Sequence, residues 1–271
     1  MNKKVAFIGA GNMASAVIGG IINSKLIDAS NVYVSNPSNG KLERLKAEYG
    51  LNTSNDNCEV ARNGEDLVFL CVKPIFLLDV INEIKDSIGE NTTVVSVAAG
   101  KSLAVMEEAF GKKVKLIRVM PNTPALVGEG CSAVVANEEA SKPENRQVFD
   151  EVCEICRSFG EVVEVPERLI DVAGQVGGAS PAWIFMVIEA LADGAVAEGM
   201  PRDMAYKFAI SGVAGAGKLA QKKNMHPGAL KDMVTSPGGT TIQGVRTLEE
   251  RGVRGAFIDA VINACEKAKT L

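Results

Sequence analysis

A short apolar run that leads straight into a glycine-rich turn constrains this fold more than any other feature. The run is residues 5–8, Val-Ala-Phe-Ile, and the turn at residues 9–14 has the spacing G-x-G-x-x-A. Gly9 permits a tight turn, Gly11 lets the backbone approach a phosphate, and the small Ala14 lets a helix pack closely on the strand. The pattern predicts a strand, turn and helix that bind a dinucleotide, although an ordinary strand-to-helix turn can share it. The expected cofactor contacts here are Gly9, Gly11, Asn12 and Met13.

Length and composition indicate a folded protein of two domains that acts on small molecules. The chain has 271 residues, of which 46% are hydrophobic and 23% are charged, proportions typical of a globular protein. Its net charge of -4 provides no basic surface for nucleic acid or for an anionic membrane. We therefore expect a small-molecule substrate, no nucleic-acid partner and no membrane.

Targeting and membrane-spanning signals are missing from the sequence pattern. The residues before the first strand lack a secretory cleavage site. The most apolar helix candidate, around residues 183–192, is interrupted by Glu189 and Asp193, so no stretch approaches the length of a membrane span. The six cysteines are scattered without the spacing of a disulfide framework, and we expect reduced thiols. These features predict a cytoplasmic protein.

The first part of the chain alternates strand and helix patterns. Amphipathic stretches with apolar spacings near 3.6 residues lie between short β-branched runs, and this alternation predicts a parallel sheet with crossover helices. We expect an α/β dinucleotide-binding domain over residues 1–165 with a Rossmann-type, doubly wound sheet. The expected strands are residues 5–8, 31–35, 67–72, 92–97, 114–120, 132–136 and 162–165.

Beyond Pro166 the β-branched runs stop, and stretches rich in Ala, Gly, Met and charged residues replace them. We expect an all-α domain over residues 166–271 that binds substrate and mediates dimerisation. The helix around residues 183–192 is apolar on nearly every side, which suits burial in a core or an interface. We predict a homodimer whose helices interleave. The expected helices are residues 167–175, 181–198, 202–222, 227–234, 239–251 and 253–269.

The second strand ends without the acidic residue that binds the ribose hydroxyls in NAD-dependent folds. Residues 35–39 read Ser-Asn-Pro-Ser-Asn, and their hydroxyl and amide groups can donate to a 2′-phosphate. Positive charge would come from Lys41 or Arg44 in the next helix. We therefore expect NADPH, with NADH as the alternative, and cofactor contacts from Ser35 and Asn36. A polar turn that caps the next helix is compatible with the same residues.

Six further motifs lie at predicted strand ends and helix starts. They are Cys71-Val72-Lys73-Pro74, Val97-Ala98-Ala99-Gly100, Arg118-Val119-Met120-Pro121-Asn122-Thr123-Pro124, Gly177-Gly178-Ala179-Ser180-Pro181-Ala182, His226-Pro227-Gly228-Ala229-Leu230-Lys231-Asp232 and Ser236-Pro237-Gly238-Gly239-Thr240-Thr241. With the glycine turn, they closely resemble the pyrroline-5-carboxylate reductase family over almost the whole chain. The resemblance implies reduction of 1-pyrroline-5-carboxylate to L-proline with NAD(P)H, the last step of proline synthesis, and it allows a ring of dimers.

Three of these motifs close predicted strands, and in an open parallel sheet ligands bind beyond the carboxyl ends of the strands. Lys73, Gly100 and Asn122 lie at such ends and should line the nicotinamide and its ribose. A surface lysine beside a rigid proline turn is the alternative for Lys73. By resemblance, Asn57 also contacts a ribose of the cofactor. The expected contacts here are Asn57, Val72, Lys73, Pro74, Ala98, Ala99, Gly100 and Asn122.

Residues 236–241 form the expected substrate site. Pro237 pushes Ser236 into an extended conformation, and two glycines then expose successive amides at a helix start. Such a nest suits a small carboxylate, although a capped helix after a Pro-Gly turn has the same residues. By resemblance, Thr241 is the catalytic residue nearest the imine nitrogen. The expected substrate contacts are Ser180, Ser236, Gly238, Gly239, Thr240 and Thr241.

Several other signals favour structure over chemistry. His226 lies at a helix entry before a proline, which suits a helix cap better than a catalytic acid. Cys153 and Cys156 have redox-motif spacing but lie within a helical pattern, and the single histidine leaves no four-ligand metal cluster, so no metal is expected. Glu189 and Asp193, one helical turn apart, are expected to be solvated or hydrogen-bonded.

Two alternative functions remain open from the sequence. One is a reductase of the same two-domain type that acts on a β-hydroxyacid or another imine, and relative rates on these substrates would distinguish it. The other is a noncatalytic NADP-binding sensor. Such a sensor is expected to have lost the motif at residues 236–241, which is intact here.

Overall fold

The computed structural model describes residues 1–269, and its contacts divide the chain into two compact units. The first unit comprises Met1–Gly178 together with the chain end from Lys267, and the second comprises Ala179–Glu266. The composition change places the boundary earlier, between residues 165 and 166. The two boundaries differ because helix α7 (Glu167–Gly174) packs on strands of the first unit.

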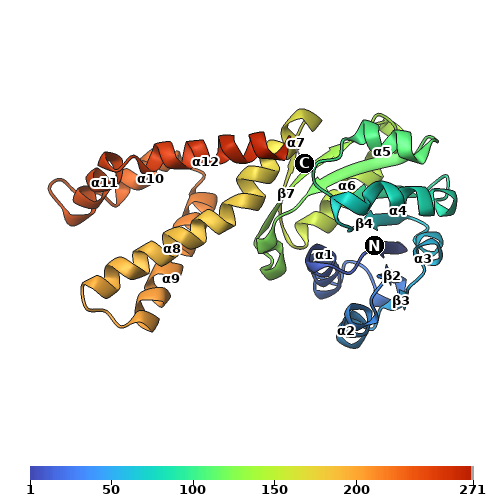
Figure 1. The fold of residues 1–271 in the computed structure, drawn as a ribbon, viewed down its shortest axis with the longest axis horizontal. Helices are drawn as coiled ribbons and strands as arrows, with labels where there is room; N and C mark the ends of the chain where they lie inside the picture. The colour runs from blue at the N-terminus through green and yellow to red at the C-terminus, as the bar shows by residue number, and fades with distance from the viewer. Residues whose placement is uncertain (270–271) are drawn as a thin grey trace. The chain divides into compact units, whose positions relative to one another are not determined.

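The first unit is built on one eight-stranded sheet with the order β3-β2-β1-β4-β5-β6-β7-β8 (Figure 1). Every neighbouring pair is parallel except β6 and β7. Ile8 of β1 pairs with both Ser35 of β2 and Leu70 of β4, so the carboxyl ends of these strands lie level at one edge. The strands are β1 (Val5–Ile8), β2 (Val32–Ser35), β3 (Asn52–Ser54), β4 (Leu67–Leu70), β5 (Thr93–Ser96), β6 (Lys115–Met120), β7 (Gly130–Ala136) and β8 (Gly160–Glu164).

Two features of the sheet differ from the sequence prediction. β7 runs antiparallel to β6, because the chain between Met120 and Gly130 is shorter than the dozen or so residues that a parallel crossover needs. β3 has no counterpart in the prediction, since its residues Asn52–Ser54 are polar and lie at the edge of the sheet. The other strands are confirmed to within two residues at each end.

Helices cover both faces of the sheet. Successive residues of a strand point to opposite faces, so each strand contributes apolar side chains to the core on either side. Val5 and Phe7 of β1 lie in one buried core, whereas Ala6 and Ile8 lie in another. This two-sided burial confirms the doubly wound α/β architecture. The helices are α1 (Asn12–Asn23), α2 (Asn39–Tyr49), α3 (Asn57–Asn63), α4 (Leu77–Ile84), α5 (Leu103–Phe110), α6 (Arg146–Arg157) and α7, with short helical segments η2 (Pro74–Phe76), η4 (Thr123–Val127) and the π-helical η6 (Gln175–Ala179).

The described part of the second unit is all-α, as the sequence predicts. Its internal core is small: α8 and α9 pack on each other and bury Ala192, Ala205 and Ala209, and none of the described residues of α10, α11 and α12 is buried. Helices with so little internal core need another surface to cover them. The helices are α8 (Ser180–Ala197), α9 (Arg202–Lys223), α10 (Pro227–Met233), α11 (Thr240–Glu250) and α12 (Val253–Ala268).

The sequence predicts no stretch long enough to span a membrane, and one helical run in the structure contradicts this prediction. Glu167–Ala197 is long and apolar enough to cross a membrane by length and composition, and almost none of it is buried within the single chain. The sequence prediction considered only residues 183–192, but the π-helical η6 joins α7 to α8 and makes the run much longer. Its exposed apolar side chains include Phe185, Met186 and Leu191.

Candidate functional site

The two glycines of the turn between β1 and α1 differ in what a side chain at each position would contact. Gly9 has a φ of +104°, and a Cβ there would lie 2.6 Å from the carbonyl oxygen of Cys71 in the neighbouring strand connection. Gly11 is the N-cap of α1 with an ordinary φ of -79°, and a Cβ there would meet nothing within 4 Å. No side chain caps the first amides of α1. The turn therefore presents open space in front of the first amides of α1, which Gly11 has no side chain to cap, and an anion can bind there.

Asn36 holds the glycine turn in place. Its Oδ1 accepts from the amide of Ala10 (3.2 Å), and its Nδ2 donates to the hydroxyl (2.8 Å) and the carbonyl of Ser38. Ser38 is the N-cap of α2, yet its side chain does not cap that helix. The polar turn thus joins β1 to β2 and leaves the start of α2 uncapped, with Lys41 exposed in the first turn.

Ser35 and Asn57 form a second polar link at the same edge. The buried Ser35 hydroxyl donates to Asn57 Oδ1 (2.7 Å), and Asn57 Nδ2 donates to Glu83 Oε2 (2.9 Å). Arg44 of α2 donates to the hydroxyl of Ser15 on α1 (3.1 Å), so its guanidinium lies beside the first helix. The structure thus brings the side chains of Ser35 and Asn57 together.

The remaining predicted cofactor residues end β4, β5 and β6. The amide of Cys71 donates to Ile8 O and that of Val97 donates to Leu70 O, which continues the register of the sheet into these loops. Lys73 is exposed and precedes η2, Ala98 is buried, and Gly100 is exposed with a φ of +72°. These loops lie at the same edge as the glycine turn because the strands before them are parallel.

Both polar atoms of the Asn122 side-chain amide are hydrogen-bonded within the protein. Its Nδ2 donates to the carbonyl of Gly177 (2.9 Å), and its Oδ1 accepts from the amide of Cys131 (2.9 Å). The buried side chain therefore ties the end of β6 to the start of β7 and to η6. Its contact with the cofactor stays a prediction.

The second unit presents the predicted substrate motif at the start of α11. Gly238 has a φ of +70°, Gly239 is the N-cap, and its amide donates to the carbonyl of Ser236 (3.1 Å). A Cβ on Gly239 would lie 2.4 Å from the Ser236 hydroxyl and 3.2 Å from its carbonyl oxygen, so a larger residue here would have to displace the serine side chain. No side chain caps α11, and Thr240 and Thr241 are exposed in its first turn. Ser180, the other predicted contact, begins α8.

The structure confirms the structural settings predicted for four side chains, His226, Cys153, Cys156 and Asp193. His226 is the N-cap of α10, and its Nδ1 accepts from the amide of Gly228 (3.1 Å). Cys153 and Cys156 lie buried on α6, and burial raises the pKa of both thiols, which keeps them protonated and unreactive. Asp193 pairs with Arg202. Within residues 1–269 no cluster of three metal-binding side chains occurs.

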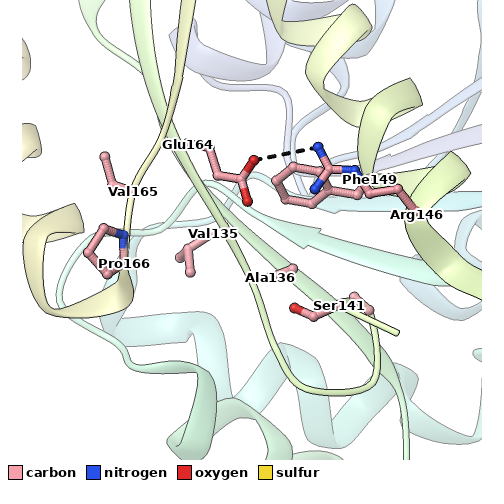
Figure 2. Close-up of a pocket in the computed structure, with 9 residues that line it drawn as sticks. Val135, Ala136, Ser141, Arg146, Phe149, Glu164, Val165 and Pro166 are labelled. Atoms are coloured by element: carbon pink, nitrogen blue, oxygen red, sulfur yellow. Dashed lines mark ion pairs between the residues drawn. The ribbon is translucent and has the colours of Figure 1, made fainter. Parts of the chain in front are cut away.

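A cleft of about 480 Å³ lies beside the end of β7 (Figure 2). Arg146 is its cationic residue, and the guanidinium pairs with Asp150 (3.0 Å) and Glu164 (3.6 Å) and lies over the ring of Phe149. Because β7 and β8 run antiparallel to the other strands, their carboxyl ends, which form this cleft, lie at the opposite edge of the sheet. The cleft is therefore separate from the predicted cofactor residues.

The buried Arg118 was not predicted as a functional residue. It lies inside β6 and pairs with Glu167 (3.3 Å) and Asp171 (2.9 Å) of α7. A charged residue inside the apolar run Leu-Ile-Arg-Val-Met was the available signal, since a buried charge needs partners. The partners themselves could not be identified, because they lie 49 and 53 residues further along the chain.

Comparisons with known proteins agree with this geometry. Residues 4–100 match the family model described as NADP oxidoreductase coenzyme F420-dependent, and residues 167–271 match the model described as pyrroline-5-carboxylate reductase dimerisation. The fold, the glycine turn and these matches define a two-domain, dinucleotide-dependent oxidoreductase.

Over 271 residues the chain is 45% identical to the pyrroline-5-carboxylate reductase of Escherichia coli, which covers 100% of this chain and 99% of that protein. The chain belongs to the pyrroline-5-carboxylate reductase family. It reduces 1-pyrroline-5-carboxylate to L-proline, the final step of proline biosynthesis.

Other relatives and solved structures extend the likeness. The enzyme of Methanosarcina acetivorans is 43% identical over 270 residues, which covers 100% of this chain and 98% of that protein. The reductase from Coxiella burnetii has a TM-score of 0.91 at 33% identity, covering 100% of this chain and 98% of that one. The Plasmodium falciparum reductase, solved with NADP bound, has a TM-score of 0.86 at 32% identity, covering 99% and 98%.

Proposed function

We propose that this chain binds NADPH along the carboxyl edge of the sheet in its first unit and the substrate carboxylate at residues 236–241 of its second. The contrast between the two turn glycines carries the cofactor assignment. The fold requires Gly9, whose Cβ would collide with the Cys71 carbonyl, but none of the described residues lies within 4 Å of the Cβ position of Gly11. A pyrophosphate fits that space and satisfies the uncapped amides of α1.

The preference for NADPH over NADH rests on the residues after β2. They include no acid to bind the ribose hydroxyls, and the start of α2 is uncapped and carries the exposed Lys41. Amides and an ammonium group favour a 2′-phosphate, which a carboxylate would repel. Ser35 and Asn57 would hold the adjacent ribose region, with Glu83 orienting the Asn57 amide.

The other strand ends would hold the nicotinamide half of the cofactor. Lys73 and Pro74 are exposed after β4, and residues 98–100 after β5 are the small Ala-Ala-Gly. When bound, NADPH supplies a hydride from its nicotinamide ring to the imine carbon. The chain's own residues bind the ring, orient it and exclude water. Near-attack positioning of this kind can contribute roughly 7–11 kcal/mol to the rate, so no strong dedicated acid is needed.

The proposed role of Thr241 is to hydrogen-bond the imine nitrogen. The Gly239 amide already donates to the Ser236 carbonyl, so the amides that follow it in the first turn of α11 would bind the substrate carboxylate. This anchor brings the ring nitrogen towards the threonine hydroxyl. The imine carbon is more electrophilic when its nitrogen is protonated. The hydride then adds to carbon, the C=N bond becomes a single bond, and the proton stays on the amine of the product.

We also propose that the protein is a cytoplasmic homodimer, which can assemble further into a ring of dimers. Support comes from the match to a dimerisation model over residues 167–271 and from the small core of the second unit. Phe185 and Phe208, on α8 and α9, are 67% and 66% exposed in the single chain. A second copy would cover these faces. The six free cysteines support a reducing compartment.

The function is tested by following NADPH oxidation when 1-pyrroline-5-carboxylate is added and by identifying the product. We expect L-proline and a much higher kcat/KM than with a 2-hydroxyacid or another cyclic imine. Tight NADPH binding without substrate-dependent oxidation would instead identify a noncatalytic sensor. A higher kcat/KM on another imine would move the assignment to that substrate.

The assembly is tested by light scattering at micromolar concentration. Phe185→Asp should shift the mass from dimer to monomer, because the charge would have to be buried in the interface. Val163→Asp is the matched control, since Val163 is 50% exposed on the edge strand β8 of the first unit. A wild-type monomer, or a dimer unaffected by Phe185→Asp, would contradict the proposal.

A further inference from the structure

Arg118 is a buried cation in the middle of the sheet, and its contacts are unusual for a residue that only stabilises the fold. Its side chain is 3% exposed, and its two terminal nitrogens reach Glu167 and Asp171. Its Nε lies buried without a partner among the described residues. The two carboxylates, by contrast, are 37% and 52% exposed on α7 and can be solvated without the arginine.

This arrangement is a poor device for stability alone. Desolvating a guanidinium is costly, and an apolar side chain of similar volume is often as stable as a buried ion pair. A buried donor without a partner adds a further desolvation cost. The position would therefore be served as well by a methionine, if packing were its only role.

Glu167 connects Arg118 to the predicted cofactor edge. Glu167 Oε1 accepts from the amide of Leu103 (2.7 Å) as well as from Arg118 Nη1 (3.3 Å). Leu103 is the first residue of α5, and the loop directly before it contains Ala98, Ala99 and Gly100. The guanidinium therefore fixes the one carboxylate oxygen that holds the end of this loop.

Alternate residues from Arg118 onward, all on one face of β6 and its continuation, contact residues 171–177 in order along the chain. Arg118 meets Asp171 of α7, and two residues further along the strand Met120 packs on Gly174, where a Cβ would lie 3.0 Å from Met120 Cγ. Two residues further again, Asn122 donates to the carbonyl of Gly177 in η6. A π-helical turn often marks a functional position. Here η6 provides the last of the contacts between β6 and residues 167–177, a series that begins at Arg118.

We propose that Arg118 is a positioning residue for hydride transfer. Through Glu167 it holds the loop of residues 98–100 against the nicotinamide, and with Asn122 it holds residues 167–177 along the end of β6. The inference rests on the cofactor site proposed above. It adds a charged positioning group, 2% exposed as a residue, that touches neither substrate nor cofactor.

The test compares Arg118→Met, Glu167→Ala and Glu167→Gln by NADPH titration, steady-state kinetics and the isotope effect with 4-deuterated NADPH. We expect Arg118→Met and Glu167→Ala to lower kcat by about tenfold or more, since a misplacement of roughly 1 Å can cost 100-fold. The KM for the imine should change less than twofold. The isotope effect on kcat should rise as hydride transfer becomes rate-limiting.

Glu167→Gln should retain more activity than Glu167→Ala, because its amide oxygen still accepts from Leu103. Arg146→Met is the matched control, since Arg146 also pairs with two carboxylates but lies at the opposite edge of the sheet. If Arg118→Met does not fold, Arg118→Lys and the Glu167 pair supply the same comparison.

Folded variants with wild-type kcat and isotope effect, changed only in melting temperature, would reduce Arg118 to a structural residue. Equal losses in Glu167→Gln and Glu167→Ala would also overturn the link through Leu103. A wild-type enzyme that shows no NADPH-dependent reduction would instead refute the proposed function itself.

Discussion

Replacing each turn glycine by alanine separates the requirement of the fold from that of the ligand. Alanine at position 9 would place a methyl group 2.6 Å from the Cys71 carbonyl oxygen and 3.0 Å from its carbon, both in backbone that cannot rotate away. The φ of +104° adds strain of about 1–2 kcal/mol for a residue with a Cβ. Overpacking of this kind costs roughly 1–3 kcal/mol, so we expect Gly9→Ala to lose about 2–5 kcal/mol of stability.

Alanine at position 11 should behave in the opposite way. Its methyl group meets nothing within 4 Å and its φ is ordinary, so the loss of stability should stay below about 1 kcal/mol, typical of an N-cap change. The methyl group would, however, occupy the space proposed for the pyrophosphate. We expect the Kd for NADPH to rise at least about tenfold, which corresponds to about 1.4 kcal/mol.

Both variants are measured by thermal unfolding and by the fluorescence of bound NADPH. One kcal/mol corresponds to roughly 2–4 °C in a protein unit of this size, so Gly9→Ala should melt several degrees below both wild type and Gly11→Ala. The reasoning fails if Gly11→Ala binds NADPH as tightly as wild type. It also fails if the two variants lose equal stability.

Three further predictions concern side chains in both units. Thr241→Ala should lower kcat by about 100-fold with the NADPH Kd changed less than twofold, and unchanged turnover in the folded variant would remove Thr241 from the mechanism. Lys41→Glu should lower kcat/KM with NADPH by about tenfold and hardly affect NADH, whereas Lys46→Glu in the last turn of α2 should affect neither; equal effects on both cofactors would contradict the 2′-phosphate assignment. Burial raises the pKa of the Cys156 thiol above its ordinary 9.0. The unfolded state therefore loses this proton first, and the free energy of unfolding should fall as the pH rises above about 9. Cys156→Ala should flatten that slope in denaturant titrations, and an unchanged slope would assign the pH dependence to other groups.

Local patterns were sufficient for much of the fold. The apolar run of β1 and the spacing of Gly9, Gly11 and Ala14 predict the strand, the turn and the helix, because each depends on neighbours within a few residues. The helices of the second unit follow from composition and from helix-start signals such as His226. The polar strand β3 and the antiparallel β7 were beyond such patterns, since strand pairing depends on partners far away in the chain.

In the candidate site, too, the sequence predicts which residues are present but not which partners they bind. Motifs identify the residues at each strand end, and the position of these residues along the chain does not reveal which side chains are bonded. Asn36 and Asn122, predicted as cofactor contacts, have their amides bonded within the protein. Polar residues at strand ends serve ligands and loops by the same hydrogen bonds, and a sequence does not distinguish the two.

The sequence by itself determined that the chain has a dinucleotide-binding α/β domain, a helical second domain and the motifs of a pyrroline-5-carboxylate reductase. Only the tertiary structure decided that Gly9 serves the fold while Gly11 faces open space, and that a buried arginine clamps α7 to β6. The reason is the range of the interactions. Turn geometry and helix periodicity arise between near neighbours, whereas the two Arg118 ion pairs and the Asn122–Gly177 hydrogen bond join residues 49 to 55 positions apart.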